Sequence, residues 1–147
     1  MEIQIRQAEE KEIAKLLQYD GHIAAKTLTD CIRQGHVYAI CLKNEIIGVL
    51  RYSFFWQSIP FLELLFIAPD CQRKGYGRHA MACWQQQMKQ LGYRDVMTST
   101  QADETAQFFY EKLGYIRAGA FFPPGQEAEE IMFKKTLDEN GGTFGGA

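Results

Sequence analysis

The chain has 147 residues, of which 46% are hydrophobic and 13% aromatic. This length is enough to bury one sizeable core but too short for two ordinary domains, so we expect a single domain over residues 1–137. A formal net charge of −2 excludes a sequence-wide basic field. We therefore expect neither a nucleic acid nor a membrane surface as a partner.

The cysteines and histidines form no recognisable metal or disulfide pattern. The four cysteines contain no C-x-x-C pair, and the three histidines complete no spacing typical of a zinc site. Residues 1–12 lack the apolar core of a signal peptide, and no apolar run approaches transmembrane length. We expect reduced thiols, no bound metal and a cytoplasmic location.

The first third of the chain predicts a strand, two helices and a hairpin. Residues 3–6 alternate apolar and polar side chains, which is typical of a strand with one buried face. Residues 36–42 and 45–55 read as strands joined at Lys43-Asn44, because Asn tolerates the positive φ of a tight turn. Between the first strand and residue 36, two segments show helical spacing of apolar residues. The first contains Ile13, Leu16 and Leu17, and the second contains Ile23, Leu28 and Ile32.

The remaining elements alternate strands and helices. Residues 61–67 form an almost wholly apolar strand that ends before Pro69, and residues 96–100 form a further short strand. Asp103 is the predicted N-cap of the last helix of the chain, which ends at Gly114. Residues 115–121 and 130–137 predict the last strands, and residues 138–147 a flexible glycine-rich tail. The long helix between the strands at 61–67 and 96–100 is marked by Ala80, Trp84, Met88 and Leu91.

This order of elements predicts an α/β (α+β) fold. Strand, two helices, three strands, helix, strand, helix and two strands fit a mixed sheet of about seven strands, with about four helices on both of its faces.

A glycine-rich segment, Gln72-Arg73-Lys74-Gly75-Tyr76-Gly77, joins the apolar strand to the long helix. Glycines let the main chain approach a ligand closely, and the start of a helix presents unpaired N–H groups and a positive dipole end. The cationic side chains of this segment and of Arg78 favour a pyrophosphate over a single carboxylate. The segment therefore predicts a site for a nucleotide-derived cofactor.

Two alternatives exist for this segment. Residues 75–80 also fit the G-x-G-x-x-A form of a dinucleotide-binding fingerprint. In such a unit an acidic residue ends the next strand, whereas here Asp95 stands at its start and no second mononucleotide half follows. The other alternative is an ordinary strand-to-helix turn with surface charges.

Two motifs together resemble a known family. The first motif follows an apolar strand and precedes a long helix, and the second spans the last helix and the beginning of the next strand. The motifs read Ile67-x-Pro69-x-x-Gln72-x-x-Gly75-x-Gly77 and Asp103-x-x-Ala106-x-x-Phe109-Tyr110-Glu111-Lys112-Leu113-Gly114-Tyr115. In both motifs the chain is similar to the GCN5-related N-acetyltransferase (GNAT) superfamily. The resemblance covers about residues 61–121, and in the N-terminal third only the order of elements is similar.

The resemblance implies a mostly antiparallel sheet whose central strands splay apart around acetyl-CoA. It implies that main-chain groups of residues 65–67 bind the pantetheine arm and that residues 72–78 bind the pyrophosphate. Asp103 stands where the superfamily frequently carries an Asn that contacts the arm, which weakens that contact. The implied cofactor-binding residues are Leu65, Phe66, Ile67, Gln72, Arg73, Lys74, Gly75, Tyr76, Gly77, Arg78, Asp103, Ala106 and Tyr110.

The resemblance also assigns the proton donor. Tyr110 occupies the family position of the general acid, and a phenol with a reference pKa of about 10 is protonated at neutral pH. Its alternative role is a core aromatic. Glu63 is the favoured base because it is the only charged residue in residues 61–67. A solvated Glu63, or one that forms a salt bridge with Arg51, is the alternative.

The implied activity is transfer of an acetyl group from acetyl-CoA to a primary amine of a small molecule or peptide. The aromatic residues Tyr52, Phe54, Phe55 and Trp56 could clamp this acceptor or fill the core. Acidic residues near Pro123-Pro124 favour a cationic acceptor; they are Glu127, Glu129 and Glu130. A CoA-binding sensor without turnover is the alternative function, and a homodimer is left open.

Overall fold

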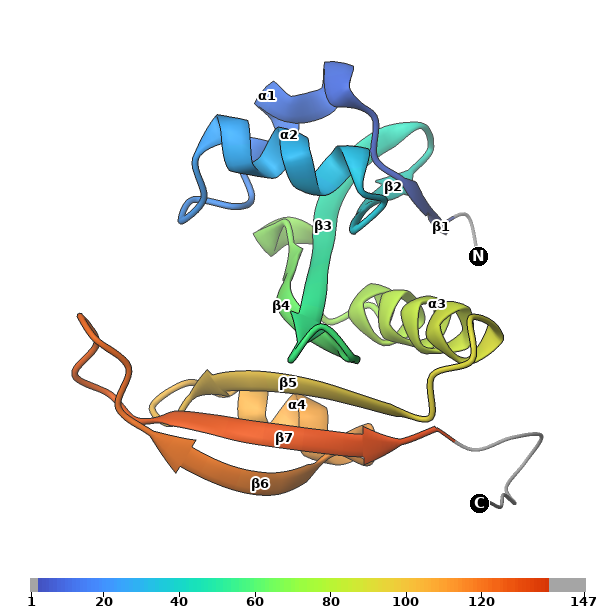
Figure 1. Ribbon diagram of the computed structural model, residues 1–147. Coiled ribbons are helices and arrows are strands. Elements are labelled where there is room, and N and C mark those ends of the chain that lie inside the picture. The colour runs from blue at the N-terminus through green and yellow to red at the C-terminus, as the bar shows by residue number, and fades with distance from the viewer. Residues whose placement is uncertain (1–2, 138–147) are drawn as a thin grey trace. The chain divides into compact units, whose positions relative to one another are not determined.

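The computed structural model describes residues 3–137 (Figure 1). They fall into two compact units. Of the described residues, the first contains 3–53 and 63–84, and the second contains 54–62 and 85–137. Three elements contribute to both units: β3 (Glu45–Phe55), β4 (Ile59–Ile67) and α3 (Tyr76–Gln90).

The first unit is built on antiparallel strands in the order β1-β2-β3, with β4 next to β3. β1 (Ile3–Gln7) pairs with β2 (Val37–Leu42), which pairs with β3. Lys43 and Asn44, at φ 53° and 66°, form the hairpin turn that the sequence predicts. A bulge opposite Ile40 and Cys41 leaves Ile47 as the extra residue of β3.

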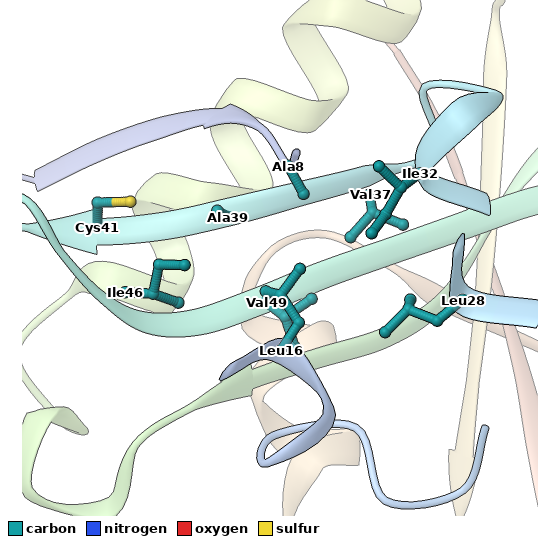
Figure 2. Packing of buried hydrophobic residues seen from close by; sticks show 9 residues of the cluster. All are labelled: Ala8, Leu16, Leu28, Ile32, Val37, Ala39, Cys41, Ile46 and Val49. Carbon is teal, nitrogen blue, oxygen red and sulfur yellow. The ribbon is translucent and has the colours of Figure 1, made fainter. Parts of the chain in front are cut away.

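Helices cover both faces of these strands. The short helix η1 (Glu10–Glu12) leads directly into α1 (Ile13–Leu17). α1 and the longer α2 (Ala25–Arg33) pack onto a cluster that includes Val37, Ala39 and Val49 (Figure 2). Successive side chains of a strand point to opposite faces, so Tyr52, three residues after Val49 on β3, lies on the face opposite to this cluster. There its ring lies 5.7 Å from the ring of Trp84 in α3. Each fully buried large apolar side chain contributes about 1.5–3 kcal/mol.

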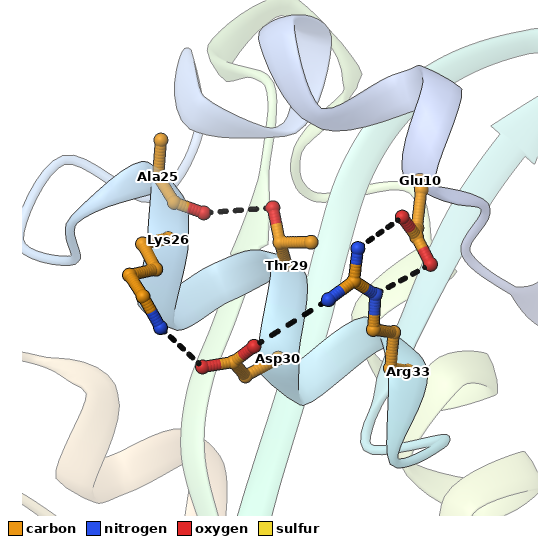
Figure 3. A network of polar contacts seen from close by, with 6 residues as sticks. All are labelled: Glu10, Ala25, Lys26, Thr29, Asp30 and Arg33. Atoms are coloured by element: carbon orange, nitrogen blue, oxygen red, sulfur yellow. Dashed lines mark hydrogen bonds and ion pairs between the residues drawn. The ribbon is translucent and has the colours of Figure 1, made fainter.

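Polar contacts fasten η1 to α2 on the surface of this unit (Figure 3). Arg33 donates to both carboxylate oxygens of Glu10, over 2.8 and 3.1 Å. Along α2, Lys26 pairs with Asp30 at 3.5 Å. These groups are exposed, so the contacts orient the helix more than they stabilise it.

The second unit has the strand order β4-β5-β7-β6. β7 (Glu130–Thr136) is antiparallel to both β5 (Asp95–Gln101) and β6 (Ile116–Phe121), and β5 is parallel to β4. α4 (Ala106–Lys112) packs its Tyr110 ring 6.3 Å from Phe133 of β7. The seven-stranded, mixed and mostly antiparallel sheet confirms the predicted fold class. In the ladder between β4 and β5, Phe61 pairs with Met97 and Leu62 with Thr98, and the splaying of the central strands stays a prediction.

Two predicted boundaries are wrong. β4 begins at Ile59, two residues before the predicted strand. Asp103 is not the N-cap of α4, which begins at Ala106 after Thr105. The Gln107 side chain stabilises the preceding turn instead, because its amide donates to the carbonyl oxygens of Ala102 and Glu104.

The predicted tail, residues 138–147, lies outside the described residues, and the single-domain boundary at residue 137 stays a prediction. Within residues 3–137, no helix is long and apolar enough to cross a membrane.

Candidate active site

The end of β4 lies directly against the backbone of β3 at Gly48. A Cβ atom at Gly48 would collide with the Phe66 carbonyl oxygen and would lie 3.2 Å from the Ile67 Cα. Beside this contact, the Ala68 N–H donates to the Ile47 carbonyl oxygen over 2.7 Å. The bulge and the glycine together fix the point from which the loop to α3 departs.

The loop itself is shaped by one side-chain bond and two left-handed residues. The Gln72 side-chain amide donates to the Ile67 carbonyl oxygen over 2.7 Å. Arg73 and Gly75 have φ values of 64° and 88°. No atom lies within 4 Å of a Cβ built on Gly75, so glycine is favoured there by its conformation and by access to the main chain. The loop then enters α3 at Tyr76.

Positive charge converges on this loop. The first intrahelical bond runs from the His79 N–H to the Gly75 carbonyl oxygen, so the amides of residues 76–78 have no helical acceptor. The exposed side chains of Arg73, Lys74 and Arg78 form no ion pair with any residue in the described part of the chain. Main-chain donors, a helix dipole and three cations suit a pyrophosphate.

Residues 65–67, the predicted contacts of the pantetheine arm, lie at the end of β4. Leu64 and Phe66 pack against the cluster under α1 and α2, and the Phe66 ring lies 5.7 Å from the ring of Tyr19. The side chains of Leu65 and Ile67 alternate with these, and Ile67 is buried. Leu65 is half-buried, and the predicted role of the main-chain groups of residues 65–67 stays a prediction.

Glu63 is held by two partners on β3. Arg51 donates to its Oε1 and Ser53 donates to its Oε2. Arg51 also binds the buried Asp20, whose Oδ2 lies 2.7 Å from the guanidinium Nε. The salt bridge anticipated as the alternative for Glu63 is thus present, while its role as the base stays a prediction.

Tyr110 is 6% exposed on the buried face of α4. Burial raises its pKa to about 12, and a hydrogen bond with Thr98 acts in the opposite direction. The Thr98 hydroxyl in turn donates to the Leu62 carbonyl oxygen over 3.0 Å. The phenol is protonated at neutral pH, as a proton donor must be. The buried ring also has the alternative role predicted for Tyr110, that of an aromatic residue in the core.

The two other residues assigned to the cofactor lie near the start of α4. Ala106 is its first residue and is half-buried, and Asp103 is exposed in the preceding turn. These residues and Tyr110 belong to the second unit, whereas residues 63–78 belong to the first.

The residues considered for the acceptor have different environments. Tyr52 is 5% exposed and serves the core, whereas Trp56 is 78% exposed in the turn after β3. Glu130 accepts hydrogen bonds from Ser99 and Gln126, over 2.6 and 3.0 Å. Glu130 therefore has structural partners, and Trp56 is the aromatic residue of this set that is open to solvent.

Four residues that contact the candidate groups or shape the strand carried no prediction; they are Asp20, Gly48, Ser53 and Thr98. Gly48 could have been found, because a glycine inside a strand often marks a close backbone approach. Thr98 fits ordinary strand alternation, and Asp20 lies between two helices, so neither gives a local signal. For metals, no group of three or more His, Cys, Asp or Glu side chains among residues 3–137 is arranged to hold an ion.

Residues 4–115 match the model of the acetyltransferase (GNAT) family. No curated protein matches the chain.

Solved structures share the fold at low sequence identity. Ard1 from Thermoplasma volcanium has a TM-score of 0.85 at 15% identity, covering 95% of this chain and 100% of that one. The ribosomal-protein-S18-alanine N-acetyltransferase from Escherichia coli has a TM-score of 0.78 at 15% identity, with coverages of 97% and 99%. PaiA N-acetyltransferase from Thermoplasma acidophilum, in complex with coenzyme A, has a TM-score of 0.76 at 16% identity, with coverages of 92% and 99%. The chain belongs to the GNAT family of acetyltransferases.

Proposed function

We propose that the chain transfers the acetyl group of acetyl-CoA to a primary amine by direct attack. The observation that carries this proposal is the loop of residues 72–78, where the unpaired amides at the start of α3 lie among three exposed cations. A pyrophosphate matches this arrangement of donors. The structural relative PaiA was solved with coenzyme A, which supports the same choice of cosubstrate.

The chemistry requires three proton transfers. Glu63, directly or through water, would first accept a proton from the ammonium group, so that a neutral amine attacks. The amine nitrogen forms a bond to the acetyl carbon, and the carbon–sulfur bond of the thioester then breaks. Tyr110 would give its phenolic proton to the departing thiolate, consistent with its pKa of about 12, and would regain a proton, directly or through water, from the nitrogen as the amide forms. A main-chain N–H of residues 65–67 would stabilise the developing oxyanion.

The acceptor is a primary amine of a small molecule or a peptide. The relative from Escherichia coli acts on a ribosomal protein, which supports inclusion of peptide acceptors. Incubation with acetyl-CoA and a panel of polyamines, amino acids, aminoglycosides and peptides, with free thiol as the readout, tests the proposal. Amine-dependent thiol release is expected, and its absence across the panel would overturn the proposal.

A sensor without turnover remains the second function, because the anion-binding loop does not by itself require catalysis. Calorimetry separates the two functions. A sensor would bind acetyl-CoA and release no thiol with any amine, whereas the enzyme does both.

A further inference from the structure

Arg51 bridges two carboxylates within the first unit. Its guanidinium contacts Asp20 through Nε at 2.7 Å and through a second nitrogen at 3.4 Å, and it contacts Glu63 through the third nitrogen. The side chains of Asp20, Arg51 and Glu63 are 1%, 12% and 35% exposed. The bridge therefore runs from a buried carboxylate to one that is open to solvent.

Both oxygens of Glu63 are engaged, one by Arg51 and the other by Ser53. A carboxylate oxygen offers two lone pairs, so each oxygen can still accept a proton or a hydrogen bond from a ligand. Two fixed donors on one strand restrain the rotation of the carboxylate. Such restraint is what a group that receives a proton in a defined direction requires.

Asp20 belongs to the segment between α1 and α2, and this segment is itself anchored. The hydroxyl of Tyr19 donates to the Ile46 carbonyl oxygen over 3.3 Å, and its ring lies beside that of Phe66. Asp20 is therefore a fixed support for Arg51. Arginine suits this place because its planar fork of five donors can serve two carboxylates at once.

We propose that Arg51 is the positioning residue of Glu63 and that Asp20 sets the orientation of Arg51. This inference rests on the proposed function, in which Glu63 accepts the proton of the amine. It deepens that function by assigning a role to a side chain that would otherwise be only part of a salt bridge.

The test uses Arg51→Lys, which keeps the charge beside Asp20 but loses the planar fork. The steady-state kcat and the KM values for the amine and for acetyl-CoA are measured for Arg51→Lys, Glu63→Gln and the double variant. Arg6→Lys is the matched control, because Arg6 forms a comparable two-bond pair with Glu12 in the same unit, over 3.0 and 2.6 Å. Thermal melting of each variant confirms that it is folded.

Arg51→Lys is expected to lower kcat about 10-fold or more, with the KM for acetyl-CoA unchanged, and Arg6→Lys to keep the wild-type kcat. In the Glu63→Gln background, Arg51→Lys should cause no further loss. An equal loss in both backgrounds would overturn the inference, because Arg51 would then act independently of Glu63. A wild-type kcat for Arg51→Lys would overturn it as well.

Ser53→Ala is a second test of the restraint on Glu63, because it removes one hydrogen bond to the carboxylate without leaving a charge unpaired. It should also lower kcat in the wild-type background and leave the Glu63→Gln variant unchanged. If Glu63→Gln alone keeps the wild-type kcat, the inference fails while acetyl transfer stands. If the wild-type chain acetylates no amine, the proposed function itself fails.

Discussion

The Thr98 hydroxyl donates a hydrogen bond of 3.0 Å to the Leu62 carbonyl oxygen, at the last residue pair of the ladder between β4 and β5. Thr98 is 1% exposed, and it also bonds the phenol of Tyr110. One buried hydroxyl thus connects the proposed proton donor to the strand that continues into Glu63.

Thr98→Val should destabilise the fold by about 1–3 kcal/mol, because it leaves buried hydrogen-bonding groups of Leu62 and Tyr110 without their partner. Chemical denaturation measures this change. Thr136→Val is the control, since Thr136 bonds Asp95 at an exposed position and its loss should cost less than about 0.5 kcal/mol. Equal effects of the two substitutions would contradict the assigned role of Thr98.

Stability should fall above pH 10. Burial raises the pKa of Tyr110 to about 12 and also raises the pKa values of Tyr38 and Tyr115. Between pH 10 and 12 the unfolded chain releases the Tyr110 proton while the folded chain retains it. The contribution of Tyr110 is therefore complete below pH 10 and decreases by up to about 3 kcal/mol by pH 12.

Urea denaturation of the wild type and of Tyr110→Phe, at intervals between pH 8 and 11, measures this effect. The variant should lose less stability with rising pH, since one of the three contributing phenols is absent. Parallel curves for the two proteins would show that the Tyr110 pKa is not raised.

Gly48→Ala should unfold the chain or destabilise it by more than about 2 kcal/mol. The new methyl group would collide with the Phe66 carbonyl oxygen, which cannot move without displacing β4. Gly21→Ala is the matched control, because no atom lies within 4 Å of its Cβ position and its φ is not positive. Its melting temperature should equal or exceed that of the wild type. A harmless Gly48→Ala would mean that β3 and β4 are not in this close contact.

Gly75→Ala should lower the affinity for acetyl-CoA, whereas Gly92→Ala, with a similar loss of stability, should not. Gly75 and Gly92 have φ values of 88° and 100° and open space around their Cβ positions. Alanine at either position should therefore cost about 1 kcal/mol of stability. Only Gly75 lies in the proposed pyrophosphate loop. Calorimetry should show a loss of affinity for Gly75→Ala alone, and equal affinities for both variants would contradict the assignment.

Most elements of the fold were predictable from local patterns. Alternation at Ile3 and Ile5 and the Lys43-Asn44 turn depend on neighbours in the chain. The start of α4 was not predictable in this way, because the turn before the helix is held by the Gln107 side chain, which donates to the carbonyl oxygens of Ala102 and Glu104. Asp103 resembles an N-cap in sequence, but the helix begins too late for it to act as one.

The candidate site was only partly predictable. The loop of residues 72–78 combines its glycines, cations and helix start within one stretch, so its sequence contains the needed information. Thr98 and Asp20 act through partners 36 and 31 residues away, at Leu62 and Arg51. No local pattern reports such pairings, because they arise only when the strands and helices pack.

The most direct test of acetyl transfer follows both products of one reaction. Wild-type protein is incubated with acetyl-CoA and the best amine of the panel, and acetylated amine is measured by mass spectrometry together with free CoA thiol. We predict equimolar amounts of acetylated amine and thiol. For Tyr110→Phe we predict that the rate falls by about 100-fold or more while the affinity for acetyl-CoA is unchanged. Thiol release without acetylated amine, or a Tyr110→Phe rate equal to that of the wild type, would contradict the account.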